Sequence, residues 1–376
     1  MSRRIALLLV GAGHAHLEIL RRLAHERPPQ IEATVVSPGD RHFYSGMTPG
    51  YLAGTYARDE ISFDVAALAQ RAGVRHIEAE AIGARPREHQ VQLANGESIH
   101  YDVASFNVGS LLVGDDRPEV AAAERIKPLH RVERLHHAVR ELAAAPSTAA
   151  ARVTVVGAGA AGIEVACALA AVLDRAKRER RIMVLDGADS ILSGYPPAFR
   201  RRVERALEEL GIELRLGSRV SGVTEGSVVL DEGPPLPSDL TVWLTGPRGG
   251  PLFSASGLPT DESGFLLVDD RLRSVADERI FAVGDCATLA PYPQTPKAGV
   301  FALRQAPILW HNLLATIGGR NLTRYRPQPD FLSILNTCDG RALLRYKRFH
   351  TWSHWAWWLK DWIDHRFVTK YQRLAR

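Results

Sequence analysis

Short apolar runs followed by glycine-rich turns mark two places in the chain. Residues 5–10 are apolar without interruption, and leucines and isoleucines recur at helical spacing behind the turn that follows. Residues 153–156 begin the same arrangement, with an alanine-rich helical pattern behind the turn. Apolar runs of this length are typical of strands buried on both faces of a parallel sheet. The pattern therefore predicts two strand–turn–helix units.

The resemblance between the two units continues further along the chain. Asn95-Gly96 and Glu232-Gly233 each separate two short runs of alternating hydrophobicity, as hairpin turns do. Each unit then closes with an apolar strand that ends in glycine, Gly109 in the first and Gly246 in the second. Three matched features in the same order indicate a duplication. We expect an α/β fold with two Rossmann-like domains, each of three layers (ββα).

The second turn has every feature of a dinucleotide site. Gly157 allows a tight turn, Gly159 allows a diphosphate to approach the backbone, and Gly162 allows the helix to pack closely on the strand. Asp186 ends the next strand, where a carboxylate binds ribose hydroxyls and repels a 2′-phosphate. This unit is therefore predicted to bind NADH rather than NADPH, with Gly246 at the edge of the site.

The first turn departs from that pattern. Gly11 and Gly13 are present, but His16 stands at the third glycine position, and the next strand ends in Ser37 instead of an acid. A serine hydroxyl can still bind a ribose, though more weakly. His14 and His16 either contact a phosphate or are satisfied locally at the start of the helix.

A third signal lies near residue 285. The apolar run 280–283 ends in Gly284-Asp285, which places a carboxylate at the end of a buried strand. Such a residue either faces a ligand, here a sugar-alcohol hydroxyl, or belongs to a simple turn.

These motifs, in this order, resemble the flavoproteins with two dinucleotide-binding domains of the pyridine nucleotide-disulfide oxidoreductase superfamily. The chain looks most like the type II NADH dehydrogenase and sulfide:quinone oxidoreductase branch, and like the flavoprotein domain fused to selenide, water dikinase in some proteins. The segments that carry the likeness are Gly11-Ala12-Gly13-His14-Ala15-His16, Tyr44-Ser45-Gly46-Met47 and Pro296-Lys297-Ala298-Gly299-Val300.

The resemblance implies a cofactor for each site and a domain order. FAD would occupy the first site, with Gly11, Gly13 and Asp285 holding it, and NADH the second. The FAD-binding domain would be discontinuous, because the NAD(H)-binding domain is inserted into it. We place the FAD-binding parts at 1–117 and 251–325, the inserted domain at 118–250, and a C-terminal segment at 326–376.

The resemblance also implies roles around the flavin. The helix that begins near Lys297 and Ala298 would point its N-terminus at the ring, and Lys297 would stabilise the reduced flavin, unless it is an ordinary exposed lysine. Glu164 would lie near the nicotinamide or be solvated in the crevice. Pro49 would approach the ring or be a turn proline. Gln305 would face a quinone, and Pro307 should kink or break its helix.

The expected reaction passes hydride from NADH to FAD and then electrons to a quinone. The chain has three cysteines, Cys167, Cys286 and Cys338, and none of the close cysteine pairs that disulfide reductases need. A sulfide- or selenium-oxidising enzyme with Cys167 and Cys338 beside the flavin is one alternative, and a non-catalytic flavin redox sensor is another. We see no metal-ligand spacing.

Charge and aromatic residues concentrate in the tail. Five of the seven tryptophans lie beyond residue 350, and residues 345–376 carry a net charge of +6 although the whole chain carries +5. The body is therefore not a nucleic-acid surface. Residues 349–376 place aromatic and basic side chains at helical spacing, which predicts a helix on an anionic membrane or one docked on the body or in a homodimer. We expect a cytoplasmic protein, with peripheral contact to the inner face of the cell membrane if the tail binds lipid.

Overall fold

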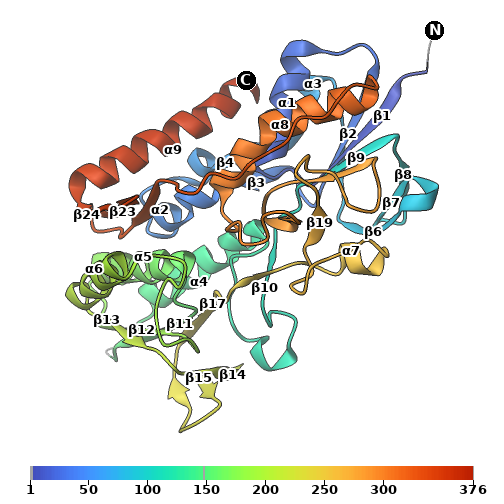
Figure 1. Ribbon diagram of the computed structural model, residues 1–376. Helices are drawn as coiled ribbons and strands as arrows, with labels where there is room; N and C mark the ends of the chain where they lie inside the picture. The colour runs from blue at the N-terminus through green and yellow to red at the C-terminus, as the bar shows by residue number, and fades with distance from the viewer. Residues whose placement is uncertain (1–2, 147–148, 376) are drawn as a thin grey trace.

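The computed structural model describes residues 3–146 and 149–375 and contains two parallel sheets, one in each half of the molecule (Figure 1). The first sheet has the strand order β20-β9-β1-β2-β5. Its strands are β1 (Ile5–Val10), β2 (Ile31–Ser37), β5 (Arg75–Glu78), β9 (Val103–Phe106) and β20 (Ile280–Ala282). Because β20 pairs in parallel with β9, the first half of this domain is completed by a strand from much later in the chain.

The second sheet repeats the central part of the first. Its order is β13-β12-β11-β17, again with parallel neighbours throughout. The strands are β11 (Ala151–Val156), β12 (Arg180–Leu185), β13 (Ile212–Arg215) and β17 (Leu240–Trp243). The predicted duplication and the insertion of the second domain into the first are therefore confirmed.

Helices cover one face of each sheet and a small antiparallel sheet accompanies each unit. In the first domain α1 (His14–Glu26) packs beside α3 (Val65–Ala72) and α8 (Gly299–Ile317). In the second, α5 (Ala160–Arg175) and α6 (Pro197–Glu209) pack on the sheet, with α4 (Val132–Ala144) beside α5. Helix α8 runs through Pro307 without interruption, so a break at this proline is wrong.

The antiparallel sheets contain both predicted hairpins. Asn95-Gly96 joins β7 (Gln90–Leu93) to β8 (Ser98–His100), and β6 (Ala81–Arg85) completes that sheet. Glu232-Gly233 joins β15 (Ser227–Leu230) to β16 (Leu236–Pro237), beside β14 (Val220–Thr224). The two insertions therefore have the same three-stranded form.

The C-terminal segment is a meander followed by one long helix. Strands β22 (Ser333–Asn336), β23 (Ala342–Tyr346) and β24 (Phe349–Ser353) precede α9 (His354–Ala375). The helix predicted over 349–376 therefore begins five residues late, because residues 349–353 pair with β23; Arg376 lies outside the described residues. Within the described part of the chain, no helix is both long and apolar enough to cross a bilayer.

Candidate cofactor and active site

The first glycine turn is packed against the end of β9. Gly11 has a φ of +85°, and a Cβ at this position would lie 2.5 Å from the carbonyl oxygen of Asn107. A Cβ at Gly13 would lie 2.4 Å from the Asn107 Oδ1 atom. Both distances are below any real Cβ contact, so the turn can form only with glycine at these positions.

Asn107, which was not predicted from the sequence, connects three elements at this turn. Its Oδ1 accepts hydrogen bonds from the backbone N–H groups of Ala15 (3.0 Å) and His16 (3.3 Å) at the start of α1. Its Nδ2 donates to the carbonyl of Val283 (2.9 Å). A polar residue directly after a buried parallel strand was the available signal, the same signal that identified Asp285.

The two histidines of the turn have different surroundings. The ring of His16 is fully buried, and burial lowers its pKa to about 4. The neutral ring donates from Nδ1 to the Gly11 carbonyl (2.6 Å) and accepts from the Ser105 hydroxyl at Nε2 (2.9 Å). His16 is therefore satisfied locally and replaces the missing glycine as a support of the turn.

His14 has an unsatisfied ring nitrogen. Burial lowers its pKa to about 4, with the nearby Asp285 charge acting in the opposite direction. Its ring stacks on Phe367 of α9 with centroids 5.8 Å apart, and its Nε2 has no hydrogen-bond partner among the described residues. A buried neutral donor or acceptor without a partner is costly, by about 1–3 kcal/mol. This orphan atom at the start of α1 fits a site that a polar cofactor completes.

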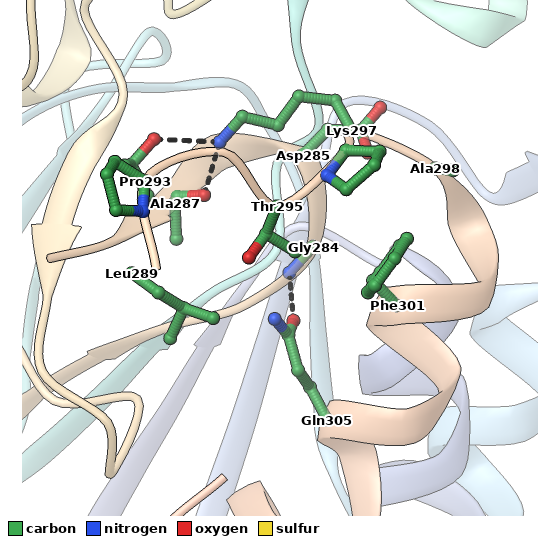
Figure 2. A pocket seen from close by; sticks show the side chains of 12 residues that line it. Gly284, Asp285, Ala287, Leu289, Pro293, Thr295, Lys297, Ala298, Phe301 and Gln305 are labelled. Atoms are coloured by element: carbon green, nitrogen blue, oxygen red, sulfur yellow. Dashed lines mark hydrogen bonds between the residues drawn. The ribbon is translucent and has the colours of Figure 1, made fainter. Parts of the chain in front are cut away.

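Asp285 lies in a short turn after β20, and Gly284 before it has a φ of +71°. Gln305 of α8 accepts a hydrogen bond from the Gly284 N–H at its Oε1 atom (2.7 Å), as Figure 2 shows. Gln305 is only 4% exposed, so the structure places it as a support of this turn. Asp285 itself is paired with Lys127 (Nζ to Oδ2, 3.2 Å), a residue that was not predicted from the sequence.

Lys297 lines the same small pocket as Asp285, Ala298 and Gln305 (Figure 2). Its ammonium donates to the carbonyl of Ala287 and to the Thr288 hydroxyl (2.9 Å), and it lies 3.9 Å from the centroid of the Phe265 ring. Burial lowers its pKa. Lys297 is therefore not an ordinary exposed lysine, and groups of the protein already satisfy its charge.

The second turn has close contacts at two glycines and open space at the third. A Cβ at Gly162 would lie 1.8 Å from the Gly157 carbonyl oxygen, and one at Gly157 would lie 2.2 Å from the carbonyl oxygen of Leu244. A Cβ at Gly159 would meet nothing within 4 Å, and the same holds at Gly246. The backbone at the N-terminus of α5 is therefore accessible to a ligand, as a diphosphate requires.

The residues at the two ribose positions make local hydrogen bonds. Asp186 accepts from the backbone N–H groups of Ala158 (2.6 Å) and Ala188 (2.8 Å), which fixes its carboxylate beside the second turn. Ser37 donates to the Gly39 carbonyl (2.6 Å) and is hydrogen-bonded to His76 Nε2 (2.9 Å).

Glu164 faces the C-terminal segment from α5. Its Oε1 accepts from the backbone N–H of Asn336 (2.7 Å). Burial raises its pKa to about 7, although the charge of Lys360 opposes this shift. Lys360 of α9 is buried and bonds to Asp364 Oδ2 (2.7 Å) and to the Gly46 carbonyl (2.6 Å). Glu164 is therefore not simply solvated.

The buried network extends to the loop that carries Pro49. Asp364 accepts from the Tyr44 hydroxyl at Oδ1 (3.0 Å). Asp364 was not predicted as a site residue because it comes from α9 at the far end of the chain. Pro49 lies in the first turn of α2 (Thr48–Leu52), which packs on α5. Cys338, with a φ of +58°, lies 3.6 Å from the Pro49 carbonyl oxygen through its Sγ, and burial raises the pKa of its thiol.

Comparison with known proteins gives consistent results. Residues 5–312 match the sequence model of the pyridine nucleotide-disulphide oxidoreductase family. An NADH dehydrogenase-like protein of Mycobacterium tuberculosis is 34% identical over 292 residues, which are 75% of this chain and 72% of that protein. Demethylphylloquinone reductase NdbB of Synechocystis is 24% identical over 93% of this chain and 94% of its own.

Solved structures share the fold over the whole chain. The sulfide:quinone oxidoreductase of Aquifex aeolicus superposes with a TM-score of 0.83 at 17% identity, covering 98% of this chain and 92% of that one. Taken together with the two glycine turns and the parallel sheets, these matches show that the chain belongs to the pyridine nucleotide-disulphide oxidoreductase family, as an NADH dehydrogenase-like oxidoreductase that uses FAD and a nicotinamide nucleotide.

Proposed function

We propose that this protein oxidises NADH through FAD and delivers the electrons to a quinone. The observation that carries the proposal is that the helices behind both glycine turns contact the elements around the expected ring: α9 lies against α1 through His14 and Phe367, and α2 packs on α5. Pro49 lies in α2 and Glu164 in α5, and Lys360 from α9 hydrogen-bonds the Gly46 carbonyl. Both glycine turns follow parallel strands, and in α/β folds ligands bind at such strand ends.

Each site has residues suited to its cofactor. Gly11, Gly13, His14 and Asp285 would hold FAD, with Lys297 and Ala298 at the start of α8 near its ring. Gly157, Gly159, Gly162, Asp186 and Gly246 would hold NADH. When bound, FAD supplies the two-electron chemistry, accepting hydride and passing electrons onward. The protein orients the two cofactors and manages the protons.

Proton handling favours a quinone over an acceptor that takes electrons alone. Reduction of a quinone to a quinol consumes protons as well as electrons. A carboxyl group with a pKa of about 7 exists in both forms at neutral pH, which suits Glu164 to accept and release a proton. The charge of Lys360 acts on the Glu164 carboxyl, and Lys360 bonds to Asp364, which accepts from the Tyr44 hydroxyl. These groups form a polar path beside Glu164. A quinone reductase is among the relatives of the chain.

The two faces of α9 support membrane contact as part of the same proposal. Its inner face is fixed to the body by buried Lys360, Asp364 and Tyr371. Its outer face exposes Trp358 (64%) and Trp362 (58%), and further exposed aromatic side chains lie nearby: Tyr346, Phe349 and Trp355. Lys347, Arg348 and Arg366 add positive charge around them. Aromatic and basic residues together favour the headgroup layer of an anionic bilayer, where a quinone is available.

Vesicle binding tests the outer face without disturbing the inner one. We expect full-length protein to pellet with vesicles that contain anionic lipid, and a Trp358→Ser/Trp362→Ser variant to pellet several-fold less while its thermal midpoint is unchanged. Equal pelleting would exclude the membrane role. A shift from dimer to monomer in the same variant, by light scattering, would assign this face to a homodimer instead.

The enzymatic proposal is tested by anaerobic stopped-flow spectroscopy. We expect the purified protein to be yellow, the flavin absorbance to be bleached by NADH, and a short-chain quinone to restore it faster than a one-electron acceptor such as ferricyanide. Protein that binds FAD but is not bleached by NADH, or that is reoxidised by the quinone no faster than by buffer, would contradict the proposal.

Sulfide oxidation is a second candidate because Cys338 lies against the Pro49 carbonyl, close to the proposed flavin site. Burial keeps its pKa raised, and Cys167 is fully buried in α5, so neither thiol is favoured as a thiolate. Cys338→Ala decides between the two candidates. Unchanged NADH:quinone activity together with no sulfide:quinone activity in either protein would reject the second.

A further inference from the structure

The segment between β9 and α4 connects the two domains. Within the described ranges 3–146 and 149–375, Lys127 is the one residue of this segment whose side chain bonds to Asp285. Its ammonium lies 3.2 Å from Asp285 Oδ2 and 2.7 Å from the Ser110 hydroxyl. Ser110 follows β9, and Asp285 follows β20, which are neighbouring strands of the first sheet. Lys127 therefore joins two strand ends at the edge where the first cofactor is expected.

The segment that carries Lys127 belongs structurally to the other domain. Glu124 lies beside β17 as an additional parallel bridge, with hydrogen bonds from its N–H to the Thr241 carbonyl (2.8 Å) and from the Trp243 N–H to its own carbonyl (2.8 Å). The Arg125 guanidinium bonds to three backbone carbonyls of the same segment: Asp115, Val120 and Ala123. These contacts fix the backbone just before the lysine, so its position is set by the second sheet.

The electrostatics of the first site need a cation near Asp285. A dinucleotide brings a doubly charged diphosphate, and the Asp285 carboxylate adds another negative charge beside it. The helix N-terminus that would offset this charge is partly used, because Asn107 accepts from the Ala15 and His16 N–H groups. Lys297 lies near but is held by Ala287, Thr288 and the Phe265 ring. Among the residues that the structure describes, Lys127 is the one whose side chain bonds directly to the carboxylate.

We propose that Lys127 is a positioning residue for FAD. It orients the Asp285 carboxylate and the Ser110 hydroxyl toward the cofactor, and it cancels the negative charge of Asp285 at a site that must accept an anionic ligand and tolerate the further negative charge of the reduced ring. The inference rests on the proposed function, since it assigns FAD to the first site. A lysine that only linked the two domains mechanically would not affect the midpoint potential of the bound flavin, whereas a positioning residue would.

Two measurements on the holoprotein and its reconstituted apoprotein test the proposal: the dissociation constant for FAD and the midpoint potential of bound flavin. Lys127→Met should weaken FAD binding about ten- to a hundredfold, the size of a lost hydrogen bond to a charged group. It should also shift the potential to more negative values, because the unpaired Asp285 carboxylate opposes electron uptake. Lys127→Arg should stay within about threefold of wild-type affinity, because it keeps the charge.

A double variant separates charge from mechanics. In Lys127→Met/Asp285→Asn the uncompensated carboxylate is gone, so the potential should return toward the wild-type value. Arg134→Met is the matched control: it removes one positive charge and an ion pair to Glu124 (3.0 Å) from the same connection, but its side chain is 77% exposed and does not contact Asp285. The dissociation constant for FAD and the midpoint potential of the bound flavin should be unchanged in this variant.

The outcomes are distinct. The inference is overturned if Lys127→Met behaves like Arg134→Met, or if it loses stability while the potential of its flavin stays at the wild-type value. Should the methionine variant fail to fold, Lys127→Gln, which removes the charge but keeps a hydrogen-bond donor, applies the same criterion. If wild-type protein itself binds no FAD, the proposed function fails; if wild type is yellow and bleached by NADH while the lysine variants match it, only this inference fails.

Discussion

The two copies of the strand–turn–helix unit differ in how the helix packs against its glycine turn. In the second copy, Gly162 brings α5 so close to the turn that a Cβ would lie 1.8 Å from a carbonyl oxygen, and the ligand side at Gly159 is open. In the first copy, His16 occupies the position of Gly162 and bonds to the turn, and Asn107 closes the space beside Gly13. A turn fixed by buried side chains suits a permanently held cofactor, and an open one suits a nucleotide that exchanges.

The same comparison extends to two glutamates at matching positions, Glu18 and Glu164. Burial acts to raise the pKa of Glu18, but hydrogen bonds from Arg21 and Lys370 outweigh it and hold the pKa at about 2. Glu164 has one backbone hydrogen bond, and burial raises its pKa to about 7. Both carboxylates face α9, so one fixes the helix and the other remains free to titrate.

Alanine substitutions at the central glycine of each turn give the strongest test of this difference in packing. Gly13→Ala drives a Cβ into Asn107 and should cost more than about 3 kcal/mol of unfolding free energy, with loss of FAD. Gly159→Ala enters open space, so its stability should remain within about 0.5 kcal/mol of wild type while the KM for NADH rises. Urea unfolding and steady-state kinetics measure the two effects. Equal stability losses would mean that the turns are packed alike.

Glu18→Gln should be the next largest change. The lowered pKa of Glu18 contributes stability that is present above about pH 4.5 and is lost as the pH falls toward 2. The variant should therefore lose about 2–3 kcal/mol at pH 7 and match wild type near pH 2. Glu88→Gln, at an exposed pair with Arg85, is the control and should be nearly neutral. Denaturant midpoints as a function of pH decide this.

Glu164→Gln should change the free energy of unfolding in the opposite direction from Glu18→Gln. A raised pKa contributes stability that is present below about pH 4.5 and is lost as the pH rises through 7, so the variant should gain up to about 2 kcal/mol relative to wild type above pH 7. The rate of quinone reduction should lose its dependence on a group with a pKa near 7. A wild-type pH profile that is flat from 6 to 8 would remove Glu164 from the proton path.

The smallest expected effect concerns the ends of β2 and β12, where the first copy has Ser37 and the second has Asp186. Asp186→Ser gives the second copy the residue of the first. Loss of the carboxylate should lower the preference for NADH over NADPH about tenfold, or roughly 1.4 kcal/mol, as the ratio of kcat/KM. An unchanged ratio would show that the carboxylate serves only the backbone groups of Ala158 and Ala188.

Local patterns in the sequence determined the architecture. Buried parallel strands are apolar throughout, tight turns need glycine, and a carboxylate at a strand end is conspicuous. Both βαβ units, both hairpins and the strand ends at Asp186 and Asp285 were therefore predicted without coordinates. These features depend on residues within a few positions of one another, which is why periodicity and spacing suffice to identify them.

Tertiary structure alone decided which distant side chains lie beside the candidate sites. Lys127 reaches Asp285 from 158 residues away, and Lys360 and Asp364 enter from a helix at the far end of the chain. The surroundings of Lys297 and the opposite pKa shifts of Glu18 and Glu164 also follow from distant partners. Electrostatic interactions depend on separation in space and on burial, and neither quantity is encoded in the spacing of residues along the chain.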